Sequence, residues 1–148
     1  MSSSDSVRDV PRPLEDPTSA VEVAVGREHF RNGEVALTVH GSGEVDVVQL
    51  RSGAERDWHA RLADDRLRAL AAELAELDIA GLRPRGGDRD PDDDPVRVAL
   101  TAAGEPVHEA RLWHADRFAD ARLDRLLTHW QALTEEVTGG ALPYGDPR

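Results

Sequence analysis

The apolar residues of this sequence follow two different periods, and the change between them constrains the fold more than any other feature. Between residues 21 and 50 apolar and polar residues alternate, as at Val35, Leu37 and Val39, which predicts strands with one buried face. From residues 64 to 77, and again from about 120 to 137, leucines recur every three or four residues. That spacing predicts two amphipathic helices.

The order of these segments predicts the fold class. Strands come first and reach a possible fourth strand through Trp58; a helix, a second hairpin over 96–113 and a final helix follow. Every strand connection is short enough for antiparallel pairing. We therefore predict an α+β domain, with a single antiparallel sheet of about five or six strands and two amphipathic helices packed on one face. The other face carries Arg, Glu, His and Thr and is expected to meet water.

Some local details follow from the same pattern. Asp64 is predicted to cap the first helix and Gly81 to end it, while the second helix is predicted to begin near Asp116 or Asp120. Val47 and Val48 are adjacent and both apolar. The alternation therefore leaves open which of them faces the helices.

The domain organisation follows from composition. We expect a disordered acidic leader over residues 1–20, which are rich in Ser, Asp and Pro, a single domain over 21–139 and a short C-terminal tail over 140–148. The leader has no apolar core typical of a signal peptide, and no run approaches the roughly 18 apolar residues of a membrane helix. These features predict a soluble cytoplasmic protein that does not bind membranes.

Residue usage excludes several chemistries. The chain has no cysteine, and all 18 of its basic side chains are arginine. Disulfides, thiolate metal sites, cysteine nucleophiles and lysine-based catalysis are therefore excluded. The net charge is −11, of which residues 86–95 contribute −4 and residues 1–20 contribute −2. Repulsion of phosphate argues against nucleic acid as a ligand, and no motif indicates a cofactor.

The acidic segment between the first helix and the second hairpin has three interpretations. It contains five aspartates: Asp88, Asp90, Asp92, Asp93 and Asp94. Its D-x-D-x-D start is typical of a calcium loop, but the sixth position is Asp93 instead of glycine and the twelfth is Ala99 instead of glutamate. A solvated connection and a docking surface for a basic protein are the other two interpretations.

Histidines provide the strongest alternative to a binding role. His108, His114 and Asp116, together with the Asp88–Asp94 segment, form a candidate ligand set for a metal-binding protein or a metal-dependent enzyme. Ordinary polar or strand-end histidines are the simpler interpretation. No G-x-S-x-G nucleophile motif occurs, and every serine lies in the leader or in a predicted turn.

Two tryptophans at strand ends are the main candidate contact residues. Trp58 and Trp113 are flanked by charge, with Arg56 and Arg111 beside them. If both rings point to the open face, they could anchor a protein partner, because Trp and Arg dominate binding hot spots. The alternative is that both rings close the ends of the sheet core.

The layout of the chain resembles that of emfourin-like small bacterial domains. The matching stretches are "GEVALTVHGSGEV", "RLRALAAELAELDI" and "PVRVALTAAGEPVHEARLW", within about residues 21–137. The resemblance implies a sheet covered on one side by helices and inhibition of thermolysin-like metalloproteases. The Gly-Gly turn and the aromatic pair associated with that group are replaced by "REHFRNG" and "ELDIAGL". No functional residues are therefore carried over.

By elimination, the sequence favours a non-catalytic protein-binding module. Such a module would act by surface occlusion, as an inhibitor, an immunity-type protein or an accessory protein. The two alternatives are the metal-dependent protein described above and a structural subunit of a larger assembly. Another protein is the expected partner in the first and third cases.

Overall fold

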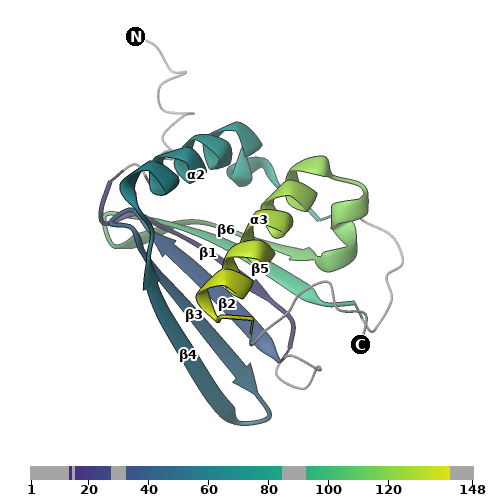
Figure 1. Ribbon diagram of the computed structural model, residues 1–148. Coiled ribbons are helices and arrows are strands. Elements are labelled where there is room, and N and C mark those ends of the chain that lie inside the picture. The colour runs from purple at the N-terminus through teal and green to yellow at the C-terminus, as the bar shows by residue number, and fades with distance from the viewer. Residues whose placement is uncertain (1–13, 15, 28–32, 85–92, 141–148) are drawn as a thin grey trace.

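A computed structural model describes residues 14, 16–27, 33–84 and 93–140. No helix among them is long and apolar enough to cross a membrane. The elements in chain order are β1 (Ala20–Val25), β2 (Glu34–His40), β3 (Glu44–Arg51), β4 (Ala54–Arg61), α2 (Asp64–Leu77), the short 3-10 helix η1 (Ile79–Gly81), β5 (Pro95–Ala102), β6 (Glu105–Trp113), a second 3-10 helix η2 (His114–Phe118) and α3 (Ala121–Val137). Figure 1 labels the six strands and the two α-helices.

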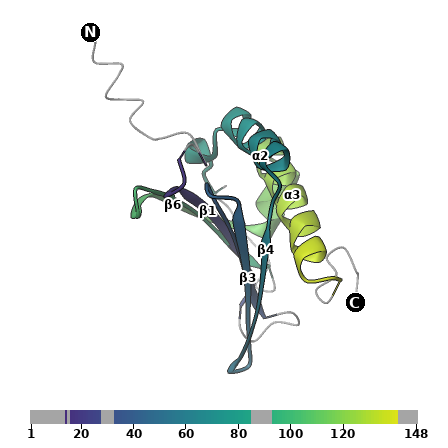
Figure 2. The same cartoon turned by 60° about the vertical axis from the view of Figure 1, so that its left-hand side comes forward.

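The strands form one sheet in the order β4-β3-β2-β1-β5-β6. Every neighbouring pair of strands is antiparallel. After β4 at one edge, the chain continues through α2 and returns to the sheet with β5, which pairs with β1. Both helices lie on the same face, as the two views in Figures 1 and 2 agree. These observations confirm the predicted α+β fold with an antiparallel sheet of six strands and two helices. The two edges are β4 and β6.

Alternation along the strands explains which side is covered. The apolar inward residues of β2 and β3 are Val35, Leu37, Val39, Val45 and Val47, all at most 3% exposed. Both helices place leucines onto them, and Trp130 of α3 is buried with its Nε1 donating to the Leu37 carbonyl over 3.0 Å. Burying this apolar surface is the main stabilising term of the fold.

The helix ends differ partly from the predictions. Helix α2 begins at Asp64, but its N-cap is Ala63 and no side chain caps it. It ends where Asp78 takes the left-handed conformation with φ of 52°, whereas Gly81 lies farther on, in η1. The prediction that Gly81 ends α2 was therefore wrong, since an aspartate also tolerates that conformation. Asp120 caps α3, accepting from the Arg122 backbone N–H over 2.9 Å.

A short segment before β1 packs onto the domain. Leu14 is buried in the core, and the Gly41 N–H donates to the Ser19 carbonyl over 2.8 Å. A Cβ added to Gly41 would lie 1.9 Å from the Asp16 carbonyl oxygen, so only glycine fits there. These contacts place Leu14 and residues 16–19 with the domain, although we expected the leader to extend to residue 20. Residues 1–13 and 141–148 lie outside the described residues.

Candidate functional site

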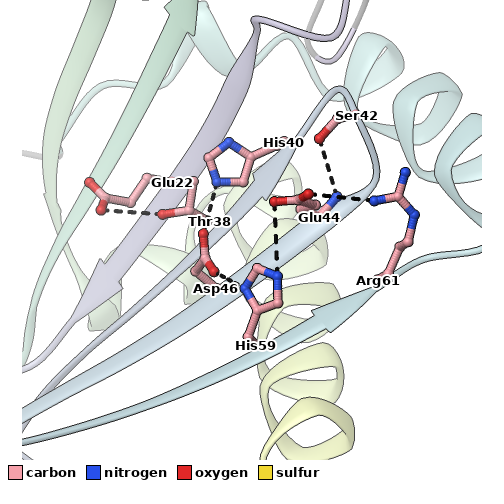
Figure 3. Close-up of polar contacts among 8 residues, drawn as sticks. All are labelled: Glu22, Thr38, His40, Ser42, Glu44, Asp46, His59 and Arg61. Carbon is pink, nitrogen blue, oxygen red and sulfur yellow. Dashed lines mark hydrogen bonds and ion pairs between the residues drawn. The ribbon is translucent and has the colours of Figure 1, made fainter.

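The uncovered face of the sheet is the candidate site, and a histidine–aspartate cluster lies on its β2–β4 half. Adjacent strands bring Asp46 of β3 between His40 of β2 and His59 of β4, because Asp46 pairs with His59 in the register and His40 precedes the β2–β3 turn. His40 Nε2 lies 3.0 Å from Asp46 Oδ2, and His59 Nδ1 contacts Asp46 Oδ1. Figure 3 shows both rings directed at the one carboxylate.

The surroundings hold this carboxylate in its charged form. Burial alone would raise the pKa of Asp46, but hydrogen bonds from His59 and His40 outweigh it and lower that pKa below its ordinary value. Beside the cluster, Glu44 lies 3.5 Å from Arg61 and 3.9 Å from His59 (Figure 3). The cluster is therefore a pre-positioned set of hydrogen-bonding groups on an open surface.

A hollow of about 590 Å³ opens beside this cluster, and its lining residues include Thr38, His40, Asp46, Val48, Asp57 and His59. Most of these side chains are polar, and Val48 supplies an apolar surface between them. A shallow surface of this kind suits a side chain of a partner protein better than an enclosed small molecule.

The β5–β6 half of the face holds the second group of charges. Arg97 lies 2.8 Å from Glu22 and 3.8 Å from Glu109, which also lies 3.8 Å from Arg111. The Arg111 side chain is 83% exposed. Together with Trp113, these two arginines line a hollow of about 380 Å³ at the end of β6. This end of the face therefore combines an aromatic ring with an exposed guanidinium.

The two candidate tryptophans lie on opposite faces of the sheet. Trp58 pairs with the fully buried Val47, so its side chain lies on the helix-covered side and packs partly against the core, although the residue, on edge strand β4, also borders the hollow of about 590 Å³. Arg56 is on the same side, 4.7 Å from the centre of the Trp58 ring. Trp113 pairs with Pro95 at the open face. The condition that both rings share the open face is therefore not met: Trp113 lies there, whereas Trp58 follows the alternative of closing the core.

The acidic segment is described only where it rejoins the sheet. Asp88, Asp90 and Asp92 lie outside the described residues. Both carboxylate oxygens of Asp93 accept from the Ala115 N–H over 3.3 Å, and the Asp94 carbonyl accepts from the His114 N–H over 2.8 Å. These bonds bring the end of the segment against η2.

This corner contains two groups with shifted pKa values. Burial raises the pKa of the Asp94 carboxyl, with neighbouring Asp93 acting in the same direction. Burial also lowers the pKa of His114, and Arg117, whose Nη1 lies 3.2 Å from the imidazole Nε2, adds to that effect. Both shifts favour the uncharged forms of these two neighbouring groups.

The other described members of the predicted metal-ligand set, His108 and Asp116, do not join Asp94 and His114 in a common site. His108 pairs with Leu100 on the helix-covered side, and its Nε2 is buried without a hydrogen-bond partner. The Asp116 carboxylate accepts from the Trp113 N–H over 2.9 Å and so closes the turn into η2. Within the described ranges, no group of three or more His, Asp or Glu side chains is arranged to hold a metal ion.

Sequence reasoning missed the His40, Asp46 and His59 cluster. Its signal was present, because the alternation that buries Val39, Val45 and Val47 turns the intervening side chains to the other face. The strand register, which the sequence leaves open, decides that these three side chains meet. Phe118 in η2, 83% exposed, was also not singled out.

No family model matches this sequence, and no curated protein matches it. The resemblance to emfourin-like domains therefore stays a prediction based on layout.

Proposed function

We propose that this protein is a non-catalytic protein-binding module that acts by surface occlusion, as an inhibitor, an immunity-type protein or an accessory protein. One observation carries the proposal: both helices cover the same face of a six-stranded sheet and, among the described residues, no helix covers the other face. A sheet face of this size with mixed aromatic, arginine and carboxylate side chains is a surface that proteins use to bind one another.

The β5–β6 half of the face supplies the contact energy in this proposal. Trp and Arg are the residue types that most often dominate interfaces, and Trp113 and Arg111 stand together beside the hollow at the end of β6. Arg97 is held by Glu22, so its position is set before a partner arrives. Pre-positioned side chains lose less conformational entropy on binding.

A second candidate is a metal-binding protein or metal-dependent enzyme centred on the corner of Asp94 and His114. The shifted pKa values of these two groups favour it, because such shifts cluster at functional sites. Metal analysis after dialysis separates the two candidates: stoichiometric retained metal supports the second, and loss of metal removes its support. The native mass measured on the same sample tests the third reading, a structural subunit of a larger assembly.

A site-specific crosslinking experiment tests the proposal. A photoreactive amino acid replaces Arg111 on the open face or, as the control, the exposed Arg68 on α2, in the native host. We expect a discrete crosslinked protein from position 111 and none from position 68. Purified partner should then bind more weakly to the Trp113→Ala variant. Crosslinks that arise only from position 68 would contradict the proposal.

A further inference from the structure

One end of the open face carries three carboxylates around two apolar side chains. In the register, Leu50 of β3 lies between Glu34 of β2 and Glu55 of β4, and Val48 pairs with Asp57 in an adjacent row. Cross-strand partners share a face, so all five side chains lie on the uncovered side. We call these five residues the acidic patch.

The carboxylates of the acidic patch differ from the others on this face. Glu22, Asp46 and Glu109 each contact an arginine or a histidine. Among the residues that the structure describes, the side chains of the three patch carboxylates have no ion-pair or hydrogen-bond partner. Neighbouring like charges repel and do not stabilise the fold. These three acidic residues therefore do not contribute to the stability of the fold.

The apolar part of the acidic patch continues into the larger hollow. Val48 and Leu50 are each half-buried between carboxylates, and Val48 and Asp57 also line the hollow of about 590 Å³. The surface thus offers an apolar floor with negative charge at its rim. A complementary ligand has cations that alternate with, or flank, an apolar side chain.

We infer that the acidic patch binds an arginine- or lysine-rich segment of the partner protein, with cationic side chains at Glu34, Glu55 and Asp57 and an apolar side chain over Val48 and Leu50. This inference rests on the proposed function and names the chemistry of its partner. The β5–β6 half of the face then contributes its own contacts through Arg111 and Trp113.

The negative charge of the acidic patch disfavours most of the other ligands that could bind there. A second copy of this chain carries the same net charge of −11, and two acidic patches facing each other would repel. Nucleic acids and anionic lipid surfaces are repelled for the same reason. A metal ion is disfavoured because no three suitable donors converge in the described part of the chain.

The test measures the binding of a labelled synthetic peptide with the repeat Arg-Gly-Val-Gly, whose extended form presents arginine and valine side chains on the same face. One double variant, Glu55→Gln with Asp57→Asn, removes two of the three negative charges of the acidic patch. The matched control, Asp64→Asn with Glu76→Gln, removes the same charge from exposed positions on α2. Unfolding measurements show whether each variant is folded. The patch variant should be at least as stable as the wild type, because it loses only repulsion between carboxylates.

The inference predicts that the patch variant weakens peptide binding by about tenfold, while the control changes it by less than about threefold. Amide chemical-shift changes should centre on β2, β3 and β4. Equal weakening by both variants would show attraction to net charge alone and would overturn the inference, as would an absence of binding at low salt. If the peptide fails but a partner still crosslinks at position 111, only this inference fails and the proposed function stands.

Discussion

The two faces of the sheet come from the same strands, yet they differ in what their side chains do. On the covered face, Val47 belongs to the buried hydrophobic core together with Leu37 and Val45. On the open face, adjacent Val48 lies among Asp46, Asp57 and histidines. The covered face is shaped by packing, where volume and apolarity matter. The open face has little packing to satisfy, so its side chains are available for recognition.

The largest expected effect comes from placing one charge on either face. Val47→Asp buries a carboxylate among apolar side chains and should lower the free energy of unfolding by about 3–5 kcal/mol or more. Val48→Asp, one residue later, should lower it by only about 1 kcal/mol. Urea unfolding followed by circular dichroism measures both. Similar losses in the two variants would break the distinction between the faces.

Replacing one tryptophan on each face should give a smaller difference in stability between the two faces. Trp130→Ala removes a buried ring and the hydrogen bond to Leu37, and it should cost about 3–5 kcal/mol. Trp113→Ala removes a half-buried ring at the open face and should cost about 1 kcal/mol or less. Thermal unfolding compares them. A Trp113 variant as unstable as the Trp130 variant would assign Trp113 to the core instead of the binding surface.

The smallest expected effect concerns pH and the Asp46 cluster. Because the pKa of Asp46 is lowered from 3.8 in the folded state, its contribution to stability is present above that value and is lost as pH falls through the folded pKa. The stability difference between wild type and Asp46→Asn should therefore shrink below about pH 4. Asp57→Asn, which breaks no ion pair among the described residues, serves as the control. A difference that stays constant to low pH would contradict the role of the two histidines.

Sequence patterns predicted the periodic parts of this molecule well. Helix α2 spans Asp64–Leu77 as the leucine spacing indicated, and the strands of both hairpins lie where alternation placed them. Periodicity is reliable there because burial of one face imposes it. Strand β4 was harder, since "AERDWHAR" carries charge on both sides. Which residues of β4 face the helices is decided by its register with β3, and the sequence alone does not define that register.

The candidate site was less predictable for a related reason. His40, Asp46 and His59 come from three strands, and Glu34, Glu55 and Asp57 from two. Their proximity depends on register, where a shift of one residue turns each side chain to the other face. The corner of Asp94 and His114 depends likewise on contacts between segments 20 residues apart. Composition identified these residue types without showing which of them meet.

Carboxylate footprinting of the partner complex tests the central claim most directly. Purified complex is labelled at Asp and Glu side chains, and labelling rates are compared with those of the free protein by mass spectrometry. Binding at the open face predicts strong protection of Glu34, Glu55 and Asp57 and unchanged labelling of Asp64 and Glu76 on α2. Protection of the helix carboxylates with full labelling of the sheet would contradict the assignment of the binding surface.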